Sequence, residues 1–518
     1  MRMHYAYRKE NDLSFRSKNN SAVKEPRQPM TKKQKTVLIA VICVTIALIV
    51  AGAVVALVLL LPKDEPPTNY PMPSMKMQYE YYIDVDDEAG ITLQDAFREQ
   101  VPLSALTRKD NVSSEGLLLS TDLKLTLTDK TQIGDKAEYE FLYKDRTIAV
   151  IKVNVIDAES YVYTADELLN LSGNGVYILN NPIDLNGKSG QIARFIGKLY
   201  CNHNPISGFD CSSGALFNEL DGAVITGLDM VDVKGTINVS DYGNYGVLAN
   251  VADNTLVRYS SVKGAVTVNS SAEKDDVVYV GGLLGYTSAS ARRNYALVDP
   301  QIVGCTSYID LTVNGTGDLR IGGITGGVRN ATIRESVSLA DINVKTTESQ
   351  IGAFNRLYLG GIAGALSKEY DTVLEAYNLD EGARIYSYAN INVDIAGGGT
   401  FNEVYVGGIY GSLTNHSLVN IHFNGKINVK LTRCNLWLGG LVGSAKNTTD
   451  LNMALRGLGV KGEINVYSLS KVLAGGVAGQ TEACTYSSVT ESITPVIDND
   501  KSLVQGTQTA SAAVASIN

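Results

Sequence analysis

The chain has 518 residues, with 49 glycines, one Trp and four His, and a formal net charge of −9. This length has room for about two to four domains, and so few His residues leave little material for imidazole catalysis or a metal site. The first 36 residues hold ten Lys and Arg against three acidic residues, a charge of +7, so residues 37–518 carry −16 for the total to reach −9. An acidic body is repelled by nucleic-acid phosphates, which excludes a polynucleotide partner.

Residues 37–61, VLIAVICVTIALIVAGAVVALVLLL, are uncharged and almost wholly apolar. As a helix rising about 1.5 Å per residue, this segment spans roughly 37 Å, enough to cross a hydrocarbon core of about 30 Å. Lys32, Lys33 and Lys35 precede it, and basic flanks stay on the cytoplasmic side. The sequence therefore predicts a basic cytoplasmic tail (1–36), one transmembrane signal-anchor (37–61) in the lipid bilayer of the cell membrane, and an extracellular body (62–518).

A cleaved signal peptide is the alternative for the same segment. Ala51-Gly52-Ala53 has the small residues of a cleavage site. However, a leader of 36 residues is long for a signal peptide, and a cut there leaves the apolar run VVALVLLL on the mature chain. We therefore expect the segment to stay uncleaved.

The extracellular body begins with a stalk and a small β-domain. Residues 62–77 hold five prolines in sixteen positions, which predicts an extended Pro-rich stalk. Over 78–157, alternating runs such as AEYEFLY and TIAVIKVNVID are separated by turn residues, as is typical of a β-sandwich. The segment 133–157 resembles the terminal strands of Ig-like repeats in cell-surface proteins, which implies an Ig-like sandwich. The acidic run from Asp84 to Glu88 is a possible calcium site. It lacks the glycine and the spacing of an EF-hand loop, so we expect an exposed turn there and no metal site.

Beyond residue 160 one phrase recurs along the chain. Its clear copies contain Gly-Gly, two further residues and a third glycine: VYVGGLLG (278–285), LRIGGITG (319–326), LYLGGIAG (357–364), VYVGGIYG (404–411), LWLGGLVG (436–443) and VLAGGVAG (472–479). GALFNEL (214–220) and YGVLANV (245–251) are weaker copies. Equivalent glycines are 32 to 47 residues apart, so the pattern indicates a repeat array with loops of variable length.

A second short motif occurs once in each repeat, at a regular place relative to the first. Ile-Asn-Val occurs at 237–239, 342–344, 391–393, 427–429 and 464–466, and VTV (266–268) and LTV (311–313) replace it in the intervening repeats. Both phrases have the period-2 pattern of strands. In LYLGGIAG, Ile362 follows Leu359 by three residues and not two, so a corner at Gly360-Gly361 is needed to keep both side chains inward. Glycine there is expected to supply unusual dihedral angles and close backbone approach, which makes each repeat one coil of a β-solenoid.

The array resembles the GLUG repeat, with the motif GG-[LIV]-x-G, of bacterial surface proteins that include adhesins and the N-terminal regions of some IgA-specific metalloproteases. YTADELLNLSGNGVYILNNPIDLNG (163–187), FIGKLYCNHNPISGF (195–209) and GALF (214–217) follow the order in which such arrays begin. The resemblance covers residues 160–495 and implies a right-handed parallel β-helix, so the expected fold class is all-β. Residues 496–518, which end in TQTASAAVASIN, are expected to form a C-terminal tail. The H-E-x-x-H motif of the proteases is absent from the chain, so protease activity is not implied.

Two rows of outward side chains follow from the predicted register. The residue before the inward aliphatic that precedes each Gly-Gly is Tyr279, Arg320, Tyr358, Tyr405, Trp437 or Leu473. Rings about 4.8 Å apart form either a surface for sugar rings or a partner protein, or a stack that staples the coils. The first five of these residues are the candidate ligand-binding residues. Asn238, Asn343, Asn392, Asn428 and Asn465 form the second row, for which we expect an amide ladder.

Five cysteines fall in the predicted extracellular body. Cys201 and Cys211 are near enough in sequence to form a disulfide in an oxidising compartment. Buried free thiols are the alternative for Cys305, Cys434 and Cys484.

Together these features predict a non-enzymatic cell-surface protein that displays a β-helical rod for adhesion. The expected ligand is an extracellular glycan or a host or matrix protein, and no cofactor is expected. A carbohydrate-active β-helix enzyme, a polysaccharide lyase or hydrolase, is one alternative and needs a groove with convergent carboxylates and a basic residue. A structural envelope rod is the other, and needs neither a groove nor an exposed aromatic patch. The step from rod to adhesion rests on analogy between folds.

Overall fold

A computed structural model describes most of the chain beyond the predicted stalk. The described residues are 77–93, 106–143, 145–273, 275–289, 301–346, 355–368, 382–395, 401–432, 434–449, 453–498, 508–511 and 513–514. None of the helices in these ranges is long and apolar enough to cross a membrane. The predicted cytoplasmic tail and membrane segment, and the stalk up to residue 76, lie outside them.

Residues 77–156 form two sheets that share one core. The first has the order β1 (Met77–Asp84), β7 (Arg146–Ile156), β6 (Lys136–Tyr143) and β3 (Thr107–Val112), and the second β2 (Ile91–Thr92), β5 (Lys124–Leu127) and β4 (Leu117–Leu119). β1 pairs with β7 in parallel, and the other pairs are antiparallel. Alternation along β7 directs Ile151 and Val153 inward, where they join Leu125 of the second sheet in one apolar cluster. The strands expected over 78–157 are therefore present.

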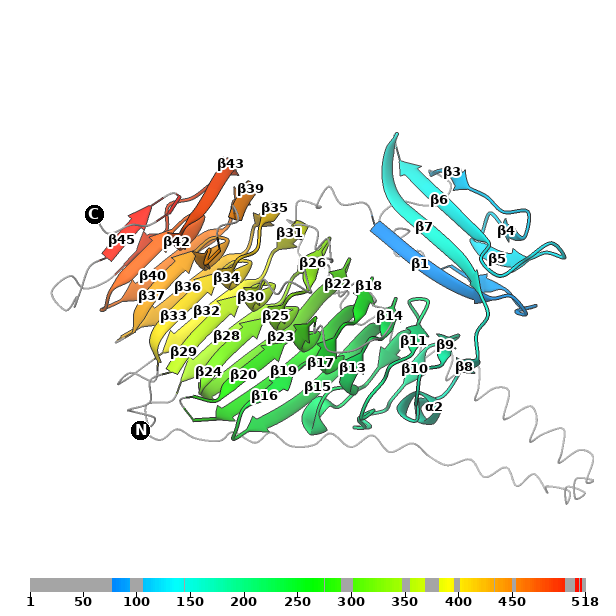
Figure 1. The fold of residues 1–518 in the computed structure, drawn as a ribbon, viewed down its shortest axis with the longest axis horizontal. Helices are drawn as coiled ribbons and strands as arrows, with labels where there is room; N and C mark the ends of the chain where they lie inside the picture. The colour runs from blue at the N-terminus through cyan, green and yellow to red at the C-terminus, as the bar shows by residue number, and fades with distance from the viewer. Residues whose placement is uncertain are drawn as a thin grey trace, which may run out of the picture. The chain divides into compact units, whose positions relative to one another are not determined.

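The rest of the described chain winds through four mainly parallel sheets (Figure 1). A typical coil passes through β16 (Gly243–Tyr245), β17 (Ala249–Asp253), β18 (Leu256–Arg258) and β19 (Ser261–Ser271), one strand in each sheet, before β20 (Val277–Gly281) returns beside β16. Aliphatic side chains of successive coils form one continuous core inside the winding. The all-β solenoid expected from the repeats is confirmed.

Two of the sheets meet at the glycine corner, and we name them for their place in the chain. The pre-corner sheet contains β16, β20, β24 (Asp318–Gly322), β29 (Asn355–Gly360), β33 (Phe401–Gly407), β37 (Asn435–Gly439), β41 (Val472–Gly475) and β45 (Gln508–Ser511). The post-corner sheet contains β13 (Phe217–Asp221), β17, β21 (Leu284–Ser288), β25 (Thr325–Arg329), β30 (Ala363–Ser367), β34 (Tyr410–Thr414), β38 (Val442–Lys446) and β42 (Ala478–Glu482). Each of the eight glycine phrases thus leads into one post-corner strand.

The short sheet covers the first coils. It contains β8 (Ser160–Val162), β9 (Val176–Leu179), β11 (Lys198–Tyr200), β14 (Val224–Thr226), β18, β22 (Gln301–Val303) and β26 (Thr332–Arg334). The helix α2 (Ala165–Leu169) lies between β8 and β9 in the chain, and Thr164 and Glu167 form its capping box. The helix-forming segment implied by the GLUG resemblance is therefore present.

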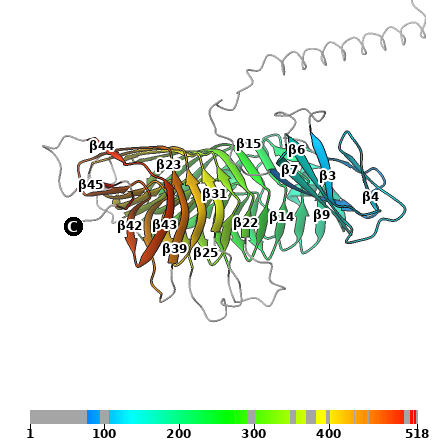
Figure 2. The same cartoon turned by 90° about the horizontal axis from the view of Figure 1, so that it is seen from above.

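The long sheet begins with β10 (Ile183–Asp184), β12 (Pro205–Ser207), β15 (Asp229–Val239), β19 and β23 (Thr306–Thr316), and then divides. One branch contains β27 (Val337–Ser338), β31 (Gly382–Ser387), β35 (Leu418–Phe423), β39 (Met453–Val460) and β43 (Cys484–Glu491). The other contains β28 (Asp341–Thr346), β32 (Asn390–Ile395), β36 (Lys426–Leu431), β40 (Glu463–Ser468) and β44 (Val496–Ile497). In this sheet β19 lies between β15 and β23. Figure 2 shows β15, β23 and β44 in succession toward the C-terminal end of the sheet. The division occurs because β23 pairs with β27 through its first residues and with β28 through its later ones.

The glycine corner is explained by close packing of the coils. Leu359 and Ile362 are both fully buried, as the predicted corner requires. None of the three glycines of LYLGGIAG has a positive φ. Instead, a Cβ on Gly361 would collide with Ser387 and with the Gly408 carbonyl of the next coil, and a Cβ on Gly364 with the backbone of the preceding coil. The expectation of close approach is confirmed, and the expectation of unusual dihedral angles is wrong.

The predicted C-terminal tail contains two strands that continue the sheets. β44 pairs with β40, and the backbone N–H of Asp498 donates to Val466 O at 2.7 Å. β45 pairs with β41, with Ala510 opposite Ala474. These pairings satisfy backbone groups that would otherwise form an open edge, so the prediction of a tail over 496–518 is wrong for the described part of this segment.

Candidate functional site

The predicted aromatic row forms, and the structure brings all of its members together. Parallel register places Tyr279 opposite Arg320, Arg320 opposite Tyr358, Tyr358 opposite Tyr405, and Tyr405 opposite Trp437. The row lies on the outer side of the pre-corner sheet, because the residues on either side of each member in the strand point into the core. Leu473 follows Trp437 at the last coil.

The rings of this row are stacked face to face. The ring centroids of Tyr358 and Tyr405 are 4.9 Å apart with planes 5° from parallel, and those of Tyr405 and Trp437 are 4.7 Å apart at 15°. The guanidinium carbon of Arg320 lies 5.0 Å from the Tyr279 ring centroid and 5.5 Å from that of Tyr358. Arg320 therefore continues the stack as a cation between two rings.

This stacking leaves few ring faces for a ligand. Both faces of Tyr405 are covered by neighbouring rings, and Trp437 is only 8 % exposed. Burial, followed by the charge of Glu403, raises the pKa of the Tyr405 hydroxyl. A sugar ring docks on an aromatic face, and here the faces contact each other. The geometry of the row therefore favours a structural role, in which the stacked rings hold adjacent coils together, over ligand binding.

The Asn residues form two ladders where the sequence predicts one. The first ladder is Asn238, Asn269 and Asn314, joined by Nδ2–H···Oδ1 bonds of 3.1 and 3.0 Å. The second ladder is Asn343, Asn392, Asn428 and Asn465, joined by bonds of 3.2, 2.9 and 3.1 Å. Register places Asn314 opposite Lys345, and Thr312 opposite Asn343. The ladders are therefore offset by two residues, and Asn238 is not equivalent to Asn343.

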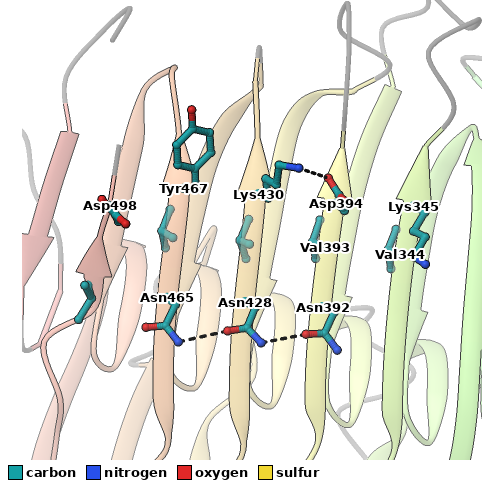
Figure 3. A pocket seen from close by; sticks show the side chains of 13 residues that line it. Val344, Lys345, Asn392, Val393, Asp394, Asn428, Lys430, Asn465, Tyr467 and Asp498 are labelled. Carbon is teal, nitrogen blue, oxygen red and sulfur yellow. Dashed lines mark hydrogen bonds and ion pairs between the residues drawn. The ribbon is translucent and has the colours of Figure 1, made fainter. Parts of the chain in front are cut away.

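A shallow groove runs beside the second ladder (Figure 3). It has a volume of about 500 Å³ and crosses β28, β32, β36, β40 and the end of β44. Asn392, Asn428 and Asn465 of the second ladder line one side. The other side is a row of exposed or half-buried side chains two positions further along each strand, which we call the outer row: Lys345, Asp394, Lys430, Tyr467 and Asp498. The backbone of the buried Val344, Val393, Val429 and Val466 lies between the two sides.

Charges in the outer row alternate along the groove. The ammonium nitrogen of Lys430 lies 3.6 Å from Asp394 Oδ1, and both side chains are about half exposed. Figure 3 shows this pair, and shows the Tyr467 ring standing at the upper end of its strand, away from the ladder. The groove therefore combines amides, charges of both signs and one aromatic ring.

Sequence reasoning missed the groove, although the repeats contain its signal. The residue directly after each Ile-Asn-Val of the later coils is Lys345, Asp394, Lys430 or Tyr467. Sequence reasoning also missed that Asn269 and Asn314 belong to a ladder. Asn269 directly follows VTV and Asn314 directly follows LTV. These positions become neighbours only through the lateral pairing of coils.

The predicted disulfide between Cys201 and Cys211 is not formed in this structure. Both residues are free thiols that are fully buried in the solenoid core. Burial raises the pKa of the Cys211 thiol to about 12 and also raises that of Cys201, so both stay protonated.

The acidic run near Asp84 caps a turn. Asp84 is 6 % exposed, and its carboxylate accepts hydrogen bonds from the backbone N–H groups of Asp86 (2.9 Å) and Ala158 (3.1 Å). The expectation of an exposed turn for the whole run is therefore wrong for Asp84. In the part of the chain that the structure describes, no group of three or more His, Cys, Asp or Glu is placed to hold a metal ion.

Comparison of the chain with protein-family models, with curated proteins and with solved structures finds no match.

Proposed function

We propose that this chain is a non-enzymatic, membrane-anchored cell-surface protein whose solenoid binds an extracellular ligand through the groove beside the second ladder. One observation carries the proposal: the same two outward positions recur on adjacent strands and enclose a groove of about 500 Å³. A repeated row of hydrogen-bonding groups suits a ligand that is itself extended and repetitive. The predicted alternatives for the ligand, a glycan and a host or matrix protein, both fit that description.

The surface location of the proposal rests on sequence. The apolar run 37–61 with its basic N-terminal flank supports a transmembrane anchor and an extracellular body. The spacing of the glycine phrases supports membership of the GLUG repeat proteins and a right-handed β-helix. The two sheets that share one core, and the antiparallel pairing of all their strands except β1 with β7, support an Ig-like identity for residues 78–157.

The arrangement of carboxylates favours binding over hydrolysis. Asp394 is on β32, and Asp498 follows β44 three strands away, a separation of about 14 Å at the usual strand spacing. A glycosidase needs its two carboxyl groups about 5 to 9.5 Å apart. Asp394 is also paired with Lys430. We therefore keep a carbohydrate-active enzyme as the second candidate only because the groove does contain carboxylates and a basic residue.

The proposal is tested with the full chain in lipid nanodiscs, probed against an array of glycans and matrix proteins. Lys430→Trp places a bulky side chain in the groove and leaves the ladder residues themselves unchanged. Lys263→Trp makes the same change at an exposed position of β19, in the same sheet but outside the groove. We expect Lys430→Trp to weaken array binding at least tenfold and Lys263→Trp to leave it unchanged. Binding of nothing by the wild type, or equal binding by both variants, would show the proposal to be wrong.

A further inference from the structure

The second ladder has unused hydrogen-bonding capacity that faces the groove. Asn392 and Asn428 each donate one hydrogen bond and accept one within the ladder. A side-chain amide has two N–H donors and two acceptor positions. One donor and one acceptor therefore remain at each coil, side by side. Hydroxyl groups, which donate and accept at once, are the natural partners for such a pair.

The formal charge of the outer row makes a polyanion an unfavourable ligand for the groove. In the outer row, Lys345 and Lys430 balance Asp394 and Asp498, so the formal charge is zero. A polyanionic polymer gains affinity from unbalanced positive charge, which is missing here. The charged side chains instead offer further hydrogen-bond donors and acceptors along the wall opposite the amides.

The spacing of the coils does not match the repeat of an extended peptide, which makes a peptide an unfavourable ligand. Neighbouring strands are about 4.8 Å apart, whereas like-facing residues of a peptide strand recur every ~6.7 Å. A peptide along the groove would lose register with the ladder within two coils. A pyranose residue in a linear chain advances by nearly one strand spacing, so each ring lies opposite one coil. In a β-1,4-linked chain successive rings are turned over, so they present their O2/O3 edge and their O6 edge to the amides in alternation.

The C-terminal end of the groove supplies apolar surface. Val496 occupies the ladder position on β44, opposite Asn465, and is 59 % exposed. Tyr467 stands on the neighbouring strand across the groove and is half-buried. An aromatic ring and an aliphatic side chain at one end of a polar groove suit the apolar face of a terminal sugar ring.

From these features we infer that the groove binds a neutral, linear glycan that lies along the solenoid axis, with about one sugar residue per coil and a terminal ring between Tyr467 and Val496. The inference rests on the proposed function and adds to it the ligand class, the direction of the chain and its length. The ladder amides bind the hydroxyls, and the outer row binds from the opposite wall.

The test is a length series of neutral β-1,4-linked gluco-oligosaccharides, from dimer to octamer, titrated into the full chain in nanodiscs. We expect affinity to rise with length and to level off near the pentamer, because the groove crosses five strands. High salt should leave this affinity unchanged, since no net charge is neutralised. Heparin serves as the polyanionic comparison and should bind more weakly than the pentamer.

Two matched pairs of variants separate the groove from general stability. Asn428→Ala and Asn269→Ala each remove the middle of a ladder, but only Asn428 lies in the groove. Tyr467→Ala and Tyr308→Ala each remove a partly exposed tyrosine of the long sheet, but only Tyr467 lies in the groove. We expect about tenfold weaker pentamer binding for each groove variant and no change for its control. The two Asn variants should lower thermal stability equally.

The outcomes distinguish the inference from the proposed function. If heparin or a protein binds and Asn428→Ala abolishes that binding, the groove is a binding site but the neutral-glycan inference is wrong. If no array component binds in a groove-dependent way, both fail. Affinity that does not depend on oligosaccharide length would contradict the predicted direction of the chain.

Discussion

At the scale of single residues, the glycines of the repeat are required by what lies next to them. Gly361 and Gly364 have no positive φ, and the atoms that a Cβ would meet belong to adjacent coils. Gly173 shows the opposite case, with a φ of +78° and nothing within 4 Å of the position that a Cβ would occupy. Glycine is therefore needed at Gly173 because the turn requires a positive φ. It is needed at Gly361 and Gly364 because the backbone of a neighbouring coil lies too close for a Cβ.

His416 is the residue that predicts a pH dependence of stability. It is 4 % exposed and its Nδ1–H donates to Ser417 O at 2.8 Å, while Nε2 has no hydrogen-bond partner in the described structure. Burial, which outweighs the hydrogen bond to Ser417, lowers its pKa from 6.5 to about 4. The folded protein therefore keeps this imidazole neutral at pH values where the unfolded chain protonates it.

We expect the contribution of His416 to the unfolding free energy to be intact above pH 6.5 and to be lost as the pH falls toward 4. The loss is on the order of 3 kcal/mol. Denaturant titrations across this range measure it, with His416→Leu as the comparison because leucine has no titrating group. Between pH 4 and 6.5, the slope of unfolding free energy against pH should be smaller for the variant by the equivalent of about one proton. An unchanged slope would contradict the assigned cause.

At the scale of elements, one mechanism builds both outward rows. Parallel strands in register place like residues of successive coils opposite one another, so a residue type repeated once per coil becomes a row. In the pre-corner sheet this gives the stack of Tyr358, Tyr405 and Trp437. In the long sheet it gives the two amide ladders. The rows therefore reinforce the lateral contacts that hold a solenoid together.

The aromatic row is predicted to stabilise the fold and not to bind the ligand. The triple variant Tyr358→Ala/Tyr405→Ala/Trp437→Ala removes two stacked pairs and the area they bury, and should lower the unfolding free energy by on the order of 5 kcal/mol. Oligosaccharide binding below its melting temperature should match the wild type. Tyr242→Ala, at a tyrosine that is 73 % exposed, is the control and should change stability by less than about 0.5 kcal/mol. Loss of binding with unchanged stability would instead identify the row as the ligand site.

At the scale of the whole molecule, the small two-sheet domain is joined to the first coils by a buried polar contact. The rings of Tyr82 and Tyr200 stack at 3.6 Å, and the Asn202 amide pairs with both backbone groups of Tyr82 at 2.8 and 2.7 Å. Arg258 Nη1 lies 3.2 Å from Glu80 Oε2, and Glu80 is 8 % exposed. Burial and the Glu80 charge raise the pKa of the Tyr82 hydroxyl, which stays protonated and donates to Glu80.

Arg258→Met is predicted to loosen this joint. It leaves the buried Glu80 carboxylate without its cation, at an expected loss of about 3 kcal/mol of unfolding free energy. Hydrogen exchange at the backbone amides of β1 should become faster. The double variant Glu80→Gln/Arg258→Met removes both charges and should recover part of the loss. Equal stability of the single variant and the wild type would show that the ion pair does not hold the joint.

Much of the fold could be predicted from local sequence pattern. Alternation in Leu357, Tyr358 and Leu359 indicates a strand, and the misplaced Ile362 indicates the corner that follows it. Neither inference needs a second coil. The position of Asn238 could not be predicted in the same way. A shift of two residues keeps every side chain on its own face, so the pattern Ile-Asn-Val fits the register of Asn343 and that of Lys345 equally well.

By itself, the sequence determined that the body is an all-β repeat array, where each coil turns its corner, and which side chains face inward. These properties depend on alternation and on glycine, both of which are local. Only the tertiary structure decided that Asn238 pairs with Asn269, that Lys345, Asp394, Lys430 and Tyr467 enclose a groove, and that aromatic faces contact one another. The physical reason is that the pairing of neighbouring coils sets the lateral register, as where β23 places Thr312, and not Asn314, opposite Asn343. A shift of two residues leaves the alternation of each strand unchanged, so the local pattern does not reveal it.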